Sequence, residues 1–243
     1  MGKPLLFSTI FCAVLATVVC TATPLSDEKI VTKREFDDTS MQSFPEYDNS
    51  AMEEQGASTE GYHKGVAYVR WGRTVCPFGA EVVYKGRAAG SHYKHSGGGS
   101  NYQCVTLQPK NFAYGPGTVA ASFMYGSEYE MWGNIPKANL HLHEHDVPCV
   151  VCYVPTRTAK IMIPGTYICP SRWTREYYGY LMAERYNHHR STFECVDHAP
   201  EKALGGHLNR NGALFYHVEP RRGSLPCPPY DQQKEMTCAV CTR

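Results

Sequence analysis

The sequence has no excess of charge of either sign, because 24 Lys and Arg residues stand against 23 Asp and Glu residues. A net charge of +1 gives no basic surface for nucleic acid, so no nucleic-acid partner is expected. The motifs Gly-x-Ser-x-Gly and His-Glu-x-x-His are absent, and Gly97–Gly99 fits a flexible turn better than a phosphate-binding loop. The sequence therefore predicts no enzyme, no catalytic residue and no cofactor.

Long hydrophobic runs are absent except for one, Leu5–Cys20, which follows Lys3. The small residues Cys20 and Ala22 occupy the two positions that a signal peptidase recognises. The pattern predicts a signal peptide over residues 1–22 and a secreted, extracellular protein with no membrane attachment after its removal. The alternative is a membrane anchor, which is disfavoured because about sixteen residues are short for a span.

Residues 23–64 have few apolar side chains and no hydrophobic period. Between Ser26 and Glu60, ten acidic residues outnumber three basic ones. Such a segment buries too little surface to offset its ordering entropy, so we expect residues 23–64 to be disordered. Lys33 and Arg34 form a dibasic pair there, which is a candidate processing site for a propeptide ending at Arg34 or a chance adjacency.

From Gly65 onward the composition shifts to Tyr, Val, Gly, Pro and Cys, with short alternating runs such as Val66–Trp71. Alternation broken by Gly and Pro turns is typical of strands, so the sequence predicts an all-β fold.

Residues 65–154 and 155–243 carry matching landmarks in the same order. The first set is Cys76-Pro77, Tyr84, Gly86, Tyr93-x-His95, Cys104 and Cys149-Val-Val-Cys152, and the second is Cys169-Pro170, Tyr177, Gly179, Tyr186-x-His188, Cys195 and Cys238-Ala-Val-Cys241. The landmarks predict a tandem duplication: a first β repeat, residues 65–154, and a second, residues 155–243, packed about a pseudo-twofold axis around one core.

The chain has eleven cysteines, of which two lie in the predicted signal peptide and eight belong to the landmarks. The two Cys-x-x-Cys pairs have the spacing of a structural zinc site or of a redox pair. Secretion instead favours structural disulfides in which each cysteine bonds outside its own pair. The predicted disulfide cysteines are Cys76, Cys104, Cys149, Cys152, Cys169, Cys195, Cys238 and Cys241, with their connectivity open.

His141, His143 and His145 are the sharpest local cluster. On a strand all three would project from one face and could bind a transition metal. The second half has no counterpart, so the favoured interpretation is a polar loop before Pro148. A metal-dependent enzyme using these histidines is the weakest of three functional hypotheses.

Several segments resemble one known family. They are Val69–Pro77, Asn101–Cys104, His145–Cys152, Tyr178–Met182, Phe193–Asp197, Asn211–Tyr216 and Leu225–Tyr230. Together they resemble the non-collagenous C-terminal domain of short-chain, spongin-type collagens and their collagen-free secreted relatives in marine invertebrates, over essentially all of residues 65–243. The resemblance implies a secreted matrix module without catalysis, all-β, disulfide-rich and duplicated like the collagen IV C-terminal domain.

Two departures from that family matter. The chain has no Gly-X-Y repeat, so it cannot itself form a triple helix. The family also has a further cysteine at the position held here by Arg222. Its replacement would leave Cys227 without a partner, which predicts a free thiol or an intermolecular bridge.

The leading functional hypothesis is a secreted, non-enzymatic component of an extracellular matrix, including the skeletal organic matrix of biomineralization. Its expected partners are other extracellular matrix proteins or further copies of itself. The alternative is a soluble secreted recognition, defence or venom protein, released by cleavage after Arg34.

Overall fold

The computed structural model describes residues 64–111, 121–131 and 141–243. The predicted signal peptide, the acidic segment up to residue 63 and the Lys33-Arg34 pair lie outside the described residues. Within the described part of the chain, no helix is long and apolar enough to cross a membrane.

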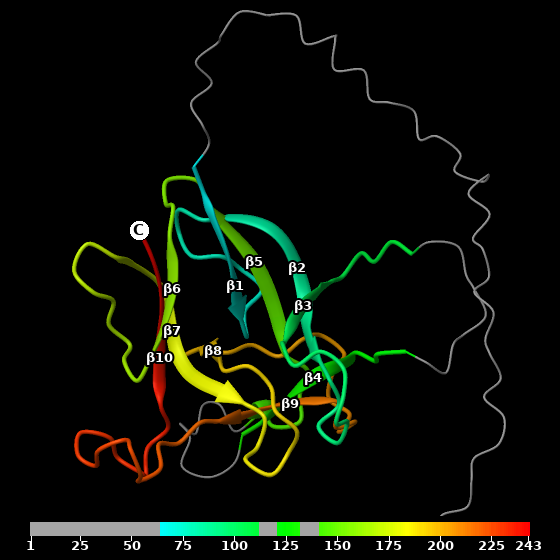
Figure 1. The fold of residues 1–243 in the computed structure, drawn as a ribbon. Helices are drawn as coiled ribbons and strands as arrows, with labels where there is room; N and C mark the ends of the chain where they lie inside the picture. The colour runs from blue at the N-terminus through cyan, green and yellow to red at the C-terminus, as the bar shows by residue number, and fades with distance from the viewer. Residues whose placement is uncertain (1–63, 112–120, 132–140) are drawn as a thin grey trace, which may run out of the picture. The chain divides into compact units, whose positions relative to one another are not determined.

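Ten β-strands make up the regular structure of these residues (Figure 1). They are β1 (Val66–Trp71), β2 (Glu81–Gly90), β3 (Gln103–Thr106), β4 (Tyr125–Glu130), β5 (Pro148–Val154), β6 (Lys160–Pro164), β7 (Thr174–Ala183), β8 (Glu194–Asp197), β9 (Ala213–His217) and β10 (Thr237–Thr242). All ten belong to one mixed sheet, so the predicted all-β class is confirmed.

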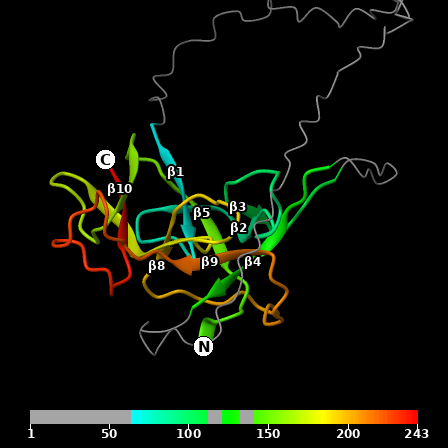
Figure 2. The same cartoon turned by 60° about the horizontal axis from the view of Figure 1, so that its bottom comes forward.

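The sheet returns on itself through β9. Its strand order is β6-β10-β7-β8-β1-β5-β2-β4-β9, with β3 added beside β2. Because Met182 of β7 lies opposite His217 of β9, the pairings close a circuit from β7 through β8, β1, β5, β2, β4 and β9 back to β7. The β1–β8 and β4–β9 pairs are parallel, and Figure 2 shows β4 beside β9. These two parallel pairs join strands from residues 65–154 to strands from residues 155–243.

The largest buried side chains inside this circuit are aromatic. Tyr102 stacks on Phe215 with a centroid separation of 4.0 Å, and Trp71 lies 6.2 Å from the same ring. Tyr129 and Met182 are fully buried in the same cluster. Aromatic side chains bury the largest areas per residue and dominate core energetics. Since these five residues come from both halves of the sequence, the halves share this core.

Glycine is required where two strand pairs approach most closely. A Cβ at Gly86 of β2 would lie 2.4 Å from the Val105 carbonyl oxygen of β3. A Cβ at Gly179 of β7 would lie 1.8 Å from the Val196 carbonyl oxygen of β8. Both glycines are sequence landmarks, and the close approach of a neighbouring backbone is the physical reason for each.

Candidate functional site

All eight landmark cysteines form disulfides, as predicted. The pairs are Cys76–Cys152, Cys104–Cys149, Cys169–Cys241 and Cys195–Cys238. No cysteine bonds within its own Cys-x-x-Cys pair, which also matches the prediction. A zinc site would need these sulfurs as thiolates, and a redox pair would need its two sulfurs to bond each other, so neither is compatible with this bonding.

The strand geometry of β5 explains why Cys149 and Cys152 do not bond each other. Residues three apart on a strand project to opposite faces of the sheet. Cys149 therefore reaches Cys104 in the aromatic core, whereas Cys152 reaches Cys76 in a second buried cluster. Cys238 and Cys241 of β10 divide in the same way between two separate partners.

Cys227 forms no disulfide within the described residues and is half-buried. It lies in the segment between β9 and β10, where it lines a surface cavity together with Arg222, Tyr230 and Lys234. Cys227 and Arg222, the position at which the resembling family carries a cysteine, thus border the same hollow. Whether the thiol is free or bridges to another chain stays a prediction.

The His141–His145 segment is a loop, as the favoured interpretation predicted, and not the strand that the metal-site alternative required. Residues 141–144 form a short helical turn. The turn places the Leu142 side chain in the aromatic core, where it is 1% exposed. His143 lies 3.6 Å from Glu130, and the Nδ1 atom of His145 lies 3.0 Å from the His143 carbonyl oxygen. Among residues 64–111, 121–131 and 141–243, no group of three or more His, Cys, Asp and Glu side chains could hold a metal ion.

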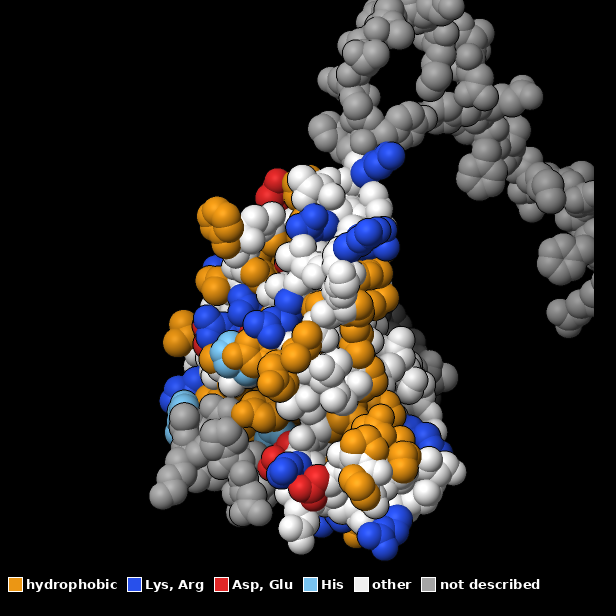
Figure 3. All heavy atoms as spheres, turned by 90° about the vertical axis from the view of Figure 1, so that its left-hand side faces the viewer, with side chains coloured by type: hydrophobic (Ala, Val, Ile, Leu, Met, Phe, Trp, Pro, Cys, Tyr) orange, Lys and Arg blue, Asp and Glu red, His pale blue; other side chains and the backbone are white. Residues whose placement is uncertain are grey.

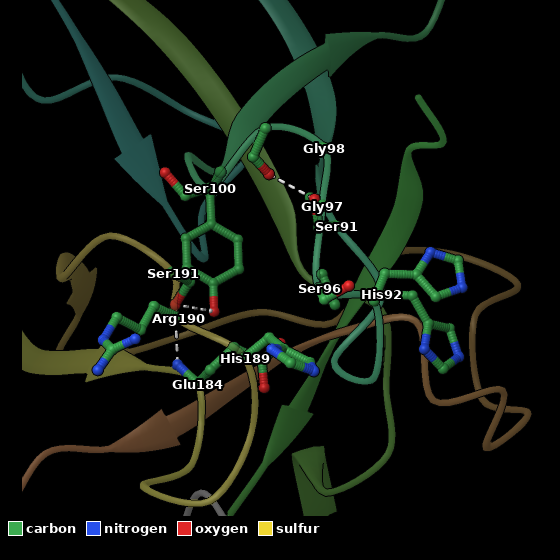
Figure 4. A pocket seen from close by; sticks show the side chains of 15 residues that line it. Ser91, His92, Ser96, Gly97, Gly98, Ser100, Glu184, His189, Arg190 and Ser191 are labelled. Carbon is green, nitrogen blue, oxygen red and sulfur yellow. Dashed lines mark hydrogen bonds between the residues drawn. The ribbon is translucent and has the colours of Figure 1, made fainter. Parts of the chain in front are cut away.

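A polar cavity of about 210 Å³ lies between two loops that are far apart in the sequence (Figure 4). One wall is the β2–β3 connection, residues 91–102, and the other is the segment after β7, residues 184–191. Gly90 of β2 and Ala213 of β9 complete the lining. Neither loop carries a recognised ligand-binding motif, so the sequence predicts no site there.

A hydrogen-bond network fixes the base of this cavity. The Leu214 amide donates to Glu184 Oε1 at 2.7 Å, and His188 Nδ1 lies 2.9 Å from Glu184 Oε2. The Glu184 amide donates to Ser191 Oγ, which donates in turn to the Tyr102 hydroxyl at 3.1 Å. The Tyr102 hydroxyl donates to the Leu214 carbonyl oxygen at 2.5 Å. The network therefore ties the β2–β3 connection, the segment after β7, and β9 to one another.

Burial shifts the pKa values of two side chains at the bottom of the cavity, Glu184 and His188. Desolvation raises the pKa of the Glu184 carboxyl to about 7, against a usual value of 4.5. Burial also lowers the pKa of His188, which touches that carboxyl. A carboxyl whose pKa lies near neutrality carries only part of its negative charge at physiological pH.

Aromatic rings build the rim beside the β2–β3 connection. His92 and His95 stack at 4.9 Å, and Tyr125 meets both rings edge-on at 5.0 and 5.4 Å. Partial burial, together with the nearby His95 and Lys94, lowers the pKa of His92. These contacts hold two imidazoles of the cavity lining in fixed positions.

No protein-family model matches this chain. The resemblance to spongin-type collagen domains therefore stays a prediction.

Proposed function

We propose that the chain is a secreted, non-enzymatic component of an extracellular matrix, such as the organic matrix of a mineral skeleton, that binds other matrix proteins or copies of itself. The observation that carries this proposal is the set of four disulfides. Disulfides persist in oxidising compartments and are rare in cytosolic proteins. Bridges spanning 43 to 76 residues in a closed sheet suit a long-lived structural module outside the cell.

The proposal includes a tandem duplication of the kind found in the collagen IV C-terminal domain, with repeats at residues 65–154 and 155–243. The disulfides support it, because each half holds one long and one shorter bridge. The long bridges, Cys76–Cys152 and Cys169–Cys241, span 76 and 72 residues. The shorter bridges span 45 and 43 residues.

Corresponding hydrogen bonds and strand pairs give further support. The Tyr84 hydroxyl lies 2.9 Å from the Cys104 carbonyl oxygen, and the Tyr177 hydroxyl lies 2.9 Å from the Cys195 carbonyl oxygen. The pairings β1–β5, β2–β5 and β2–β3 have counterparts in β6–β10, β7–β10 and β7–β8. Two β units of unrelated origin would not be expected to share both these hydrogen bonds and these strand pairings.

An open sheet edge supports the binding of matrix partners. In the described part of the chain β6 pairs with β10 alone, so its other edge presents unpaired backbone groups. Hydrophobic side chains gather on the side of the molecule that carries β6 (Figure 3). Tyr167 and Ile168, which follow β6, are 51% and 60% exposed. An unpaired edge beside exposed apolar side chains is a surface suited to association.

The unpaired Cys227 favours covalent attachment within such a matrix. It is half-buried in a surface segment, so only a local shift would be needed for its sulfur to bond a second chain. The alternative function, a soluble recognition, defence or venom protein, is favoured by the polar cavity, since matrix assembly has no need of a ligand pocket.

Mass spectrometry of native material distinguishes the two functions. The insoluble matrix and the soluble secreted fraction are compared, and the N-terminal peptide is determined in each. Enrichment in the insoluble matrix is the expected result. A soluble form that begins at Glu35, directly after the dibasic pair, would overturn the matrix role and support a processed effector.

A further inference from the structure

The cavity between the β2–β3 connection and the segment after β7 has the features of a binding site. The cavity has a volume of about 210 Å³, and hydrogen bonds between protein groups hold its base in place without a ligand. Figure 4 shows Ser191 and Glu184 at one side of the hollow and the loop of Ser96–Gly98 at the other. The chemistry of the lining indicates what it binds.

We propose that this cavity binds an oxyanion, namely a sulfate or carboxylate group, either as a free ion or carried by an acidic polysaccharide. The proposal goes beyond the matrix function and does not depend on it, since a soluble protein could use the same site.

The charges of the lining favour an anion. Arg190 carries a permanent positive charge, and His92, His95 and His189 add three imidazole rings to the lining. Glu184 is the sole carboxylate among the lining residues. Both of its oxygens already have partners, Leu214 N and His188 Nδ1, so the carboxylate is not presented to a ligand as a free acceptor.

Two polar side chains of the lining, Arg190 and Ser96, have hydrogen-bond donors without a partner in the described part of the chain. Arg190 is one of the lining residues, and within the described part of the chain its guanidinium has no hydrogen bond or ion pair. The Ser96 hydroxyl is likewise without a hydrogen bond within that part of the chain. A planar guanidinium is the side chain best suited to bind sulfate and carboxylate groups through two parallel hydrogen bonds.

The glycine loop lets a ligand approach the backbone closely. A Cβ added at Gly97 or Gly99 would meet nothing within 4 Å, so the space beside both residues is open. Gly98 has a φ of +95°, a conformation that favours glycine. Backbone N–H groups exposed in such a loop can bind anions.

The size of the cavity sets how much of a ligand it can hold. Cavities that enclose a drug-sized molecule measure about 300–1,000 Å³. A hollow of about 210 Å³ suits a single charged group, so a polysaccharide would bind through one sulfate or carboxylate while its chain lay outside.

Isothermal titration calorimetry on the full secreted chain, at constant ionic strength, tests the proposal. The probes are sodium sulfate, a sulfated oligosaccharide and the same oligosaccharide without sulfate. The variant is Arg190→Gln, and the matched control is Arg185→Gln, which removes an arginine from the same segment but outside the cavity. Arg190 is exposed and without a hydrogen bond in the described structure, so neither substitution should change the thermal unfolding midpoint.

We expect sulfate to bind the wild type and Arg185→Gln equally, and Arg190→Gln to lose about tenfold or more in affinity, since a hydrogen bond to a charged group is being removed. Tighter binding of the sulfated oligosaccharide than of free sulfate would identify a polysaccharide ligand, and equal affinity would identify the free ion. The proposal is overturned if neither sulfated probe binds, if both variants lose affinity equally, or if the unsulfated oligosaccharide binds as tightly as the sulfated one.

Discussion

Arg70 of β1 donates from Nε to the buried carboxylate of Asp197 at 2.8 Å, and its Nη2 atom lies 2.7 Å from the same oxygen. The Asp197 side chain is 0% exposed, and its second oxygen accepts a hydrogen bond from the Ala199 amide. The ion pair joins β1 to the end of β8, beside the parallel contact of Trp71 with Val196. It therefore fixes one of the two junctions between the halves of the domain.

Replacement of Arg70 by Met should destabilise the fold by about 3–5 kcal/mol, because a buried carboxylate loses its cation. The double variant Arg70→Met, Asp197→Leu should recover much of that loss, since no uncompensated charge remains. Urea unfolding with the disulfides intact measures both. Arg221→Met is the control, because Arg221 is 73% exposed in its ion pair with Glu219 and should change stability by less than about 0.5 kcal/mol. Equal stabilities for Arg70→Met and the double variant would contradict a dominant charge effect.

Alanine at Gly179 should destabilise the β7–β8 pair by about 3 kcal/mol, because its Cβ would overlap the Val196 carbonyl oxygen. Gly86→Ala should act in the same direction at β2–β3, where the approach to Val105 is slightly less close. Gly126→Ala on β4 is the matched control, since a Cβ there meets nothing within 4 Å. Thermal unfolding compares the three variants, and a Gly126→Ala variant as unstable as Gly179→Ala would refute the steric explanation.

The sequence predicts much of this fold because the landmarks mark positions with strict backbone requirements. Gly86 and Gly179 lie where a partner strand leaves no room for a side chain, and the cysteine spacing of β5 and β10 directs neighbouring sulfurs to opposite faces. The alternation of side chains along a strand also predicts that Cys149 and Cys152 bond to partners on opposite faces of the sheet. It could not have chosen between Cys76 and Cys104 for each.

Two features, the burial of Leu142 and the cavity around Glu184, cannot be predicted from local sequence patterns. The sequence favours a loop at His141–His145, which is correct, but it gives no sign that Leu142 of that loop is buried in the aromatic core. The cavity depends on closure of the sheet, since only the pairing of β9 with both β4 and β7 brings Glu184 next to Leu214 and Tyr102. No periodicity in the sequence marks Glu184, because its role comes from tertiary contacts alone.

The raised pKa of Glu184 predicts a loss of stability as the pH rises. Between pH 4.5 and about 7 the folded state binds more protons at this carboxyl than the unfolded state. The contribution of Glu184 to stability should therefore fall by up to about 1.4 kcal/mol for each pH unit in that window. The charged groups around the carboxyl are His188, Glu130 and Arg185. Glu184→Gln should remove this dependence, and chemical denaturation at several pH values measures it.

His217 should oppose Glu184 over part of this range. Burial lowers its pKa to about 4, so acidification from pH 6.5 towards pH 4 should destabilise the fold. The two effects offset each other in the wild type between about pH 4.5 and 6.5. Glu184→Gln should expose the His217 effect as stability that rises with pH, and adding His217→Asn should remove the part of that rise that comes from His217. A wild type and a Glu184→Gln variant with the same pH profile would contradict the assignment.

A cysteine placed at Arg222 should form a bridge with Cys227 within the chain. Arg222 and Cys227 border the same surface cavity, and the resembling family carries a cysteine at the Arg222 position. The wild type should show one reactive thiol per chain, or a dimer that a reductant dissolves. Arg222→Cys should show neither, since both sulfurs would be bonded internally.

Thiol titration and non-reducing electrophoresis measure this, with Arg221→Cys as the control, because Arg221 does not line the cavity. Two free thiols in Arg222→Cys, or identical behaviour of both variants, would show that Cys227 is not the stranded half of an ancestral bridge.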